Sequence, residues 1–183
     1  LSVMFYDLVG YTKLTKHLTP TETFELLNHI YPIFDKIVLE EFGGTIDKKM
    51  GDGALVLFGL DGNEDHPDSA IRAAIRLQQA LREHGAAIVK KAYKSQDNLP
   101  ELSLRVGISS GEVMLGILGE RGGHTDYTTI GSSTNEAQRL QSGAKPGRIV
   151  VNKRAYLKTK EWLQAKPIVI TGKPGEAPYQ AYE

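Results

Sequence analysis

The segment over residues 44–59, GTIDKKMGDGALVLFG, constrains the fold of this chain more than any other. TIDKK places one apolar residue between polar ones and ALVLF is continuously apolar, and we expect both segments to be β-strands. Gly51 and Gly53 flank Asp52 and give the backbone the freedom that a hairpin tip needs. The sequence therefore predicts two paired strands with one carboxylate in the tight turn between them.

A second carboxylate, Asp7, ends another apolar run, LSVMFYD. Two aspartates at strand ends can meet in space and hold divalent cations through hard oxygen ligands. That geometry suits phosphoryl-transfer chemistry on a nucleotide. Taken singly, each residue has an ordinary explanation, because Asp is common in turns and at helix starts. The prediction of a metal site therefore depends on the whole set of motifs.

The first half of the chain predicts a strand, a helix and the hairpin, followed by a second helix. Residues 2–8 form a buried strand, and Thr19-Pro20-Thr21-Glu22 is a capping box with proline in the first turn, so a helix begins there and extends to Glu41. Its apolar residues recur at helical spacing: Phe24, Leu27, Ile30, Tyr31, Phe34, Ile37 and Val38. The second, amphipathic helix is marked by Ala70, Ala73, Ala74, Leu77 and Leu81.

The second half predicts shorter elements. We expect a strand pair over residues 102–109 and 112–118 around Gly111, a short helix over 135–142, and late strands over 148–151 and 167–170. The resulting α+β order is a ferredoxin-like βαββαβ core, with helices packed on one face of an antiparallel sheet and additional strands and helices at the C-terminal end. Without internal repeats or linkers, residues 1–183 are expected to form a single domain.

Composition excludes several classes of function. The 22 basic and 22 acidic residues balance, so no positive surface for nucleic acid or an anionic membrane is expected. Cysteine is absent, which excludes disulfides, thiolate metal sites and cysteine nucleophiles. No apolar run approaches a membrane span, so we expect a cytoplasmic domain without membrane contact of its own. Because the chain begins inside a predicted strand, we expect an excision from a longer regulated protein, with a regulatory domain N-terminal to it and a membrane anchor possible in the full-length chain.

Three motifs occur in order along the chain: FYDLVGYT at residues 5–12, DKKMGD at residues 47–52 and DYTTIGSSTNEAQRL at residues 126–140. With these motifs the chain resembles the catalytic domain of class III nucleotidyl cyclases, nearly from end to end. In that family, the first two motifs carry aspartates that bind two Mg²⁺ or Mn²⁺ ions.

The resemblance implies that Asp7 and Asp52 are these metal ligands, and that Leu8 contributes its backbone carbonyl. Two cations about 3.5–4 Å apart can neutralise a triphosphate and lower the pKa of the attacking 3′-hydroxyl. The carboxylates inferred above from strand ends are thus the same residues that the resemblance assigns to metal.

Two residues are implied to read the base. Lys48 stands where the family places a base-reading lysine, and Thr128 resembles the bacterial adenylate cyclase subgroup that pairs lysine with threonine. An ammonium has only donors, so it satisfies the N1 acceptor of adenine but meets the N1–H of guanine donor to donor. The Thr128 hydroxyl can accept from the adenine amino group and can equally donate, so discrimination against GTP falls mostly to Lys48.

Four further residues are implied to contact the ribose and phosphates. Asn135 and Arg139, four apart at a helix start, project from one face. The resemblance gives Asn135 the ribose and Arg139 the charge developing on the α-phosphate, for which a planar guanidinium is suited. Arg121 and Lys173 are implied to contact the other phosphates.

Glu136 and Gln138 depart from the family pattern, because they replace positions that are commonly small or apolar. None of the departures removes a presumed catalytic group. They leave open how the helix over residues 135–142 is oriented.

The resemblance implies that ATP is converted to 3′,5′-cyclic AMP and pyrophosphate in composite sites at the interface of a head-to-tail homodimer. One chain would supply Asp7, Asp52 and Arg121, and the other Lys48, Thr128, Asn135, Arg139 and Lys173. Two alternatives stay open: a guanylate cyclase, against which Lys48 argues, and a nucleotide-binding regulatory domain without turnover. The regulatory input cannot be read from these residues.

Overall fold

The computed structural model describes residues 1–16, 18–92, 101–118, 126–171 and 178–183, and for residues 118 and 126–128 it describes the backbone alone. The helices are α1 (Tyr11–Thr15), α2 (Pro20–Asp35), the π-helical segment η1 (Lys36–Glu41), α3 (His66–Ala92), α4 (Ser132–Gly143) and α5 (Lys153–Thr159). The strands are β1 (Ser2–Val9), β2 (Thr45–Met50), β3 (Gly53–Phe58), β4 (Ser103–Ser110), β5 (Met114–Leu118), β6 (Asp126–Ile130), β7 (Ile149–Asn152), β8 (Pro167–Ile170) and β9 (Tyr179–Tyr182).

Seven strands form one mainly antiparallel sheet in the order β2-β3-β1-β4-β7-β9-β8. Strand β1 lies antiparallel between β3 and β4, and β4 is parallel to β7. With α2 between β1 and β2 and α3 between β3 and β4, the first four strands have the order and connections of a ferredoxin-like core. The predicted α+β fold is confirmed, and α4, α5 and β7 to β9 are among its C-terminal additions.

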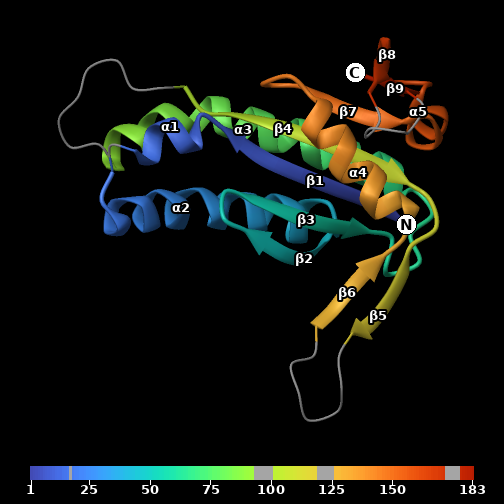
Figure 1. Ribbon diagram of the computed structural model, residues 1–183, viewed down its shortest axis with the longest axis horizontal. Coiled ribbons are helices and arrows are strands. Elements are labelled where there is room, and N and C mark those ends of the chain that lie inside the picture. The colour runs from blue at the N-terminus through green and yellow to red at the C-terminus, as the bar shows by residue number, and fades with distance from the viewer. Residues whose placement is uncertain (17, 93–100, 119–125, 172–177) are drawn as a thin grey trace.

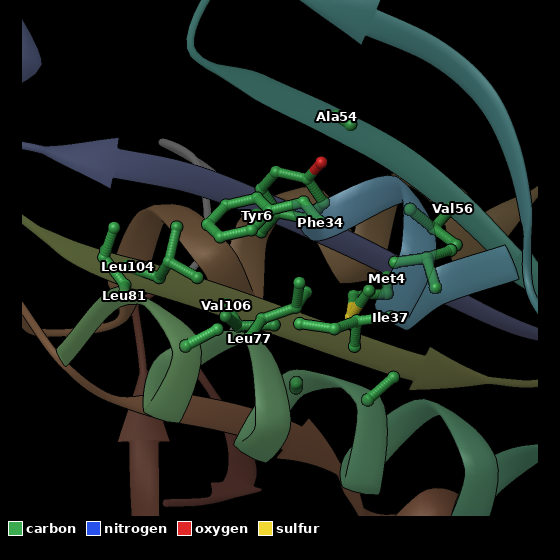
Figure 2. Close-up of a cluster of buried hydrophobic side chains, with 14 of the residues drawn as sticks. Met4, Tyr6, Phe34, Ile37, Ala54, Val56, Leu77, Leu81, Leu104 and Val106 are labelled. Atoms are coloured by element: carbon green, nitrogen blue, oxygen red, sulfur yellow. The ribbon is translucent and has the colours of Figure 1, made fainter. Parts of the chain in front are cut away.

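The larger core lies between the sheet and helices α2 and α3. Met4 and Tyr6 of β1 are buried in one cluster with Phe34 of α2 and Leu77 of α3 (Figure 2). The rings of Tyr6 and Phe34 meet edge to face, with centroids 5.6 Å apart. Because strand side chains alternate, this core takes every second residue of β1.

Helix α2 begins where the capping box predicts. The Glu22 N–H donates to the Thr19 hydroxyl at 3.3 Å, and the Thr19 N–H donates to the Glu22 carboxylate at 2.8 Å. The helical path reaches Glu41 as predicted, although its last six residues are π-helical. None of the helices in the described ranges combines the length and the apolar character needed to cross a membrane.

The other face of the sheet is covered by α4, which corrects the expectation that helices lie on one face alone. Val3 and Phe5, which alternate with Met4 along β1, pack with Ala137 of α4. Figure 1 shows α4 in front of β1 and β4, with α3 behind them. Helix α4, which carries Asn135 and Arg139, is therefore separated from α2 and α3 by the sheet.

Gly107 of β4 allows this helix to approach the sheet. A Cβ at Gly107 would lie 2.1 Å from the backbone nitrogen of Gln141 and 2.3 Å from the carbonyl oxygen of Ala137. Any side chain here would push α4 outward. The position of α4 thus depends on a residue that contributes no side chain.

The expected pairing of residues 102–109 with residues 112–118 is wrong. Strand β4 lies between β1 and β7 in the main sheet, whereas β5 pairs antiparallel with β6 in a separate two-stranded sheet. Figure 1 shows this β5–β6 hairpin projecting away from the main sheet. The sequence pattern located both strands, but the partner of β4 is β1, about a hundred residues earlier, and no local signal specifies such a pairing.

Candidate active site

The predicted metal ligands Asp7 and Asp52 are brought together at the end of the β1–β3 pair. Asp7 is in register with Gly53, and the Leu8 N–H donates to the Asp52 carbonyl oxygen at 3.3 Å. Gly53 permits this approach, because a Cβ there would lie 2.4 Å from the Tyr6 carbonyl oxygen. Backbone pairing therefore fixes the two aspartates side by side.

The turn that carries Asp52 is also held from α2. Gly51 has a φ of 64°, in the left-handed region that favours glycine. The Tyr31 hydroxyl donates to the Gly51 carbonyl oxygen and lies 3.3 Å from that of Gly53. The two glycines thus serve different needs: Gly51 supplies the turn conformation and Gly53 supplies room for β1.

The surroundings of Asp52 disfavour the ionisation of its carboxyl group. Partial burial, and after it the negative charge of Asp7, raises the pKa of Asp52 from 3.8 to about 6. The positive charge of Arg105 opposes this rise. Arg105 lies directly opposite Asp7 on β4 and forms a salt bridge with its carboxylate. A bound cation would relieve the remaining repulsion.

This donor set fits a hard cation held by few protein oxygens. Within the described ranges, no group of three or more histidine, aspartate or glutamate side chains could hold a metal ion. The Leu8 N–H and C=O point to the same side of the strand, so the Leu8 carbonyl is directed toward the Asp52 turn. Two carboxylates and one carbonyl leave coordination positions for phosphate and water, as Mg²⁺ sites often do.

The predicted catalytic residues Asn135 and Arg139 lie one turn apart on α4. Together with Ser132, Glu136 and Tyr179 they line a pocket of about 430 Å³. Arg139 also lines a neighbouring pocket of about 600 Å³ that extends to Thr171. The arrangement places an amide and a guanidinium at an open cavity large enough for part of a nucleotide.

A polar network holds the first turn of α4 against the sheet. The Ser109 hydroxyl donates to the Glu136 carboxylate at 2.6 Å, and the Asn152 amide nitrogen donates to the same oxygen at 2.8 Å. The Asn152 side chain also accepts from the Ser110 N–H at 3.2 Å and from the Ala155 N–H at 2.9 Å. Glu136, the departure from the family pattern, thus joins α4 to β4, β7 and α5.

Lys48, Asp7 and α4 share one face of the sheet. Lys48 lies on the edge strand β2 opposite Leu55, which packs with Phe5 in the cluster under α4. Asp7 follows Phe5 by two residues, so it points to the same face. Helices α2 and α3 occupy the opposite face, so the sheet separates them from Lys48 and from α4, whereas the Asp52 turn is contacted by Tyr31 of α2.

Three predicted substrate-binding residues are not placed in full. Arg121 and Lys173 lie outside the described residues. The backbone of Thr128 lies in β6 opposite Gly116 of β5, and its side chain is not described. Their roles stay predictions.

Sequence reasoning missed the supporting roles of three residues: Tyr31 at the Asp52 turn, Arg105 beside Asp7, and Glu136 in the network that holds α4. A basic residue inside the apolar run LSLRVGISS was an available signal for Arg105. Glu136 was visible as a departure, but its partners come from distant segments. Tyr31 occupies an apolar position of the helical pattern, which does not distinguish a hydroxyl that supports a turn.

Comparison with known proteins gives a consistent result. The family model of the adenylate and guanylate cyclase catalytic domain matches residues 1–180. An adenylate cyclase of Anabaena cylindrica is 34% identical over 145 residues, which is 79% of this chain and 27% of that protein. Two solved structures share the fold across 99% of this chain: the adenylyl cyclase CyaB from P. aeruginosa, with 28% identity, 91% of that chain covered and a TM-score of 0.83, and the guanylyl cyclase Cya2, with 27% identity, 89% covered and a TM-score of 0.86.

The relatives are longer than this chain, and they differ among themselves in whether they are named adenylyl or guanylyl cyclases. The chain spans 27% of the Anabaena protein and 11% of a membrane guanylyl cyclase of Dictyostelium discoideum. Both adenylyl and guanylyl cyclases occur among them, so membership alone leaves the purine open. The family match over nearly the whole chain, together with the paired aspartates and the placement of α4, establishes that this chain belongs to the class III adenylyl and guanylyl cyclase catalytic domains.

Proposed function

We propose that this domain is an adenylate cyclase, which converts ATP to 3′,5′-cyclic AMP and pyrophosphate. The observation that carries this proposal is that Asp7 adjoins the Asp52 turn and lies on the same sheet face as Lys48 and as the helix that bears Asn135 and Arg139. The 34% identity to an adenylate cyclase is in keeping with this choice of base.

Asp7, Asp52 and the Leu8 carbonyl are proposed to hold two divalent cations, Mg²⁺ or Mn²⁺. Cations bound there would lower the pKa of the 3′-hydroxyl and neutralise phosphate charge. Arg105 keeps the Asp7 carboxylate in one orientation through their salt bridge. The raised pKa of Asp52 supports the proposal, because it marks negative charge that lacks full compensation by the protein.

Asn135 is proposed to bind the ribose and orient its 3′-hydroxyl toward the α-phosphorus. Arg139, on the same helix face, donates to the oxygens on which charge develops during the in-line attack. Arg121 and Lys173 are proposed to contact the remaining phosphates. Pyrophosphate is the leaving group, and no protein side chain is assigned as the general base.

Lys48 and Thr128 are proposed to recognise adenine. The Lys48 ammonium donates to adenine N1 and the Thr128 hydroxyl accepts from the amino group. With GTP, the ammonium faces the N1–H of guanine, and two donors are left without acceptors.

The active form is proposed to be a head-to-tail homodimer with two composite sites. The β5–β6 hairpin supports this proposal, since Met114, Ile117 and Ile130 expose 72%, 70% and 50% of their surface. A two-stranded hairpin is marginal alone, and such apolar side chains are suited to burial against a partner. In the longer protein, a regulatory domain N-terminal to this one is proposed to control the dimer.

The test is product identity. Purified protein is incubated with ATP or with GTP and Mn²⁺, beside an Asp52→Ala control, and the products are separated by chromatography. Cyclic AMP from the wild type alone is the expected result. Cyclic GMP as the main product would identify the guanylate cyclase alternative. ATP binding without turnover would identify a regulatory binding domain.

A further inference from the structure

Two consecutive side chains of the edge strand β2 meet each other. In a regular strand, neighbouring residues point to opposite faces. The register of β2 against β3 shifts between Ile46, opposite Val56, and Lys48, opposite Leu55, so Asp47 is the extra residue of a β-bulge. The Asp47 carboxylate oxygen Oδ2 lies 3.5 Å from Lys48 Nζ.

The two side chains differ sharply in exposure. The Asp47 side chain is 3% exposed and that of Lys48 is 40% exposed. Asp47 Oδ2 is buried and accepts no hydrogen bond from any residue that the structure describes. A buried carboxylate is costly unless a positive charge compensates it, so Asp47 attracts the Lys48 ammonium and limits its orientations.

We propose that Asp47 is a positioning residue for base recognition: it holds the Lys48 ammonium toward the purine and thereby strengthens the preference for ATP over GTP. This inference rests on the proposed function, in which Lys48 contacts the base. The bulge gives Asp47 this role, because without it the carboxylate would point to the opposite face from Lys48.

Positioning matters because lysine ends a flexible four-carbon stem. A side chain that is ordered before binding loses less entropy when the ligand arrives, an effect of about three- to ten-fold in affinity. The same ordering strengthens rejection of GTP, because an ammonium that cannot turn away meets the guanine N1–H. Loss of Asp47 should therefore act on the two nucleotides in opposite directions.

The adjacent lysine provides a matched control. Lys49 Nζ pairs with the Asp35 carboxylate at 2.7 Å, and Lys49 lies opposite Ala54, on the sheet face that packs against α2 and α3. Asp35→Asn and Asp47→Asn thus each remove one carboxylate from one of two neighbouring lysines, on opposite faces of the same strand.

The experiment measures kcat/KM with ATP and with GTP, in the presence of Mn²⁺, for the wild type, Asp47→Asn, Asp35→Asn, Lys48→Ala and the double variant Asp47→Asn/Lys48→Ala. For Asp47→Asn we expect an ATP-to-GTP ratio about three- to ten-fold lower, with the loss for ATP mainly in KM. Asp35→Asn should keep the wild-type ratio. In the Lys48→Ala background, Asp47→Asn should change the ratio no further, since the two residues act through one ammonium.

The outcomes separate the positioning role from the proposed function. If Lys48→Ala lowers the ratio but Asp47→Asn does not, the positioning role is overturned and the adenylate cyclase assignment stands. An equal loss for both nucleotides, or an equal change in ratio for Asp35→Asn, also overturns it, because either result indicates a general structural effect. If the wild type forms no cyclic AMP, both proposals fail. Should Asp47→Asn show no thermal unfolding transition, Asp47→Ser is measured in its place under the same criteria.

Discussion

The two halves of the candidate site are fixed in different ways. Asp7 and Asp52 are set by backbone: a strand register, a left-handed Gly51 and the bare Cα of Gly53. Asn135 and Arg139 are set by the position of a whole helix, which depends on side chains from distant segments, with Glu136 at their centre. The carboxylate half is therefore held by backbone pairing, whereas the helix half can be shifted by changing the side chains that anchor α4 to the sheet.

The largest expected effect tests whether the two halves serve the same site within one chain. Asp52→Ala and Arg139→Ala should each lower kcat/KM by about a thousand-fold or more, since each removes charge compensation in the transition state. In a head-to-tail dimer, mixed chains form heterodimers in which one site keeps both residues. Random mixing should restore about a quarter of the wild-type activity.

The heterodimer is verified by giving the two variants different affinity tags and capturing them in sequence. If verified heterodimers stay inactive, the composite site is refuted and both halves act within one chain.

The next effect tests the backbone of the carboxylate half. Gly53→Ala would place a Cβ 2.4 Å from the Tyr6 carbonyl oxygen, so β1 and β3 must separate at Asp7. We expect the free energy of unfolding to fall by about 2–3 kcal/mol and Mn²⁺-dependent activity to fall with it. Gly116→Ala is the control, because no atom of the residues that the structure describes lies within 4 Å of the Cβ it would add. Urea unfolding of both variants measures the difference, and equal stability would show that the close approach is not required.

The helix half should respond more weakly and mainly in kcat. Glu136→Gln removes the negative charge of the carboxylate that accepts hydrogen bonds from Ser109 and Asn152, and should lower the free energy of unfolding by about 1–2 kcal/mol. The shifted helix should lower kcat several-fold at nearly constant metal affinity. Glu161→Gln, the same change at an exposed position, should leave stability and kcat unaltered. Loss of Mn²⁺ affinity in Glu136→Gln would contradict the independence of the two halves.

The same contrast explains what the sequence could predict. The carboxylate half arises within one hairpin and one neighbouring strand, so turn chemistry and apolar patterns located Asp52 and Asp7, and the family motifs added Lys48, Asn135 and Arg139. The pairing of β4 with β1, the face taken by α4 and the partners of Glu136 depend on residues far apart in sequence. Alternation and helical spacing carry no information on such partners, and the β4–β5 pairing was accordingly predicted wrongly. The bulge at Asp47 was also invisible, because the consecutive polar residues Asp47, Lys48 and Lys49 carry no apolar pattern from which a shift in register could be read.

The smallest expected effect is electrostatic and concerns the carboxylate half without metal. The pKa of Asp52 is about 6 in the folded domain against an ordinary 3.8, so between these pH values the folded state keeps a proton that the unfolded state has lost. Stability from this group is therefore full below pH 3.8 and falls as pH rises to about 6. Because Asp52 is partly exposed, solvent screening limits the loss to about 1 kcal/mol, or about 2–4 °C in Tm.

In EDTA, Asp52→Asn should thus unfold at a higher temperature than the wild type at pH 7.5, and the difference should vanish near pH 4. Adding Mn²⁺ at pH 7.5 should reverse the order, since only the wild type gains stability from the bound cation. A difference that does not depend on pH would mean that the variant acts through packing of the turn, and the repulsion between the two carboxylates would then not be the feature that prepares this half of the site for metal.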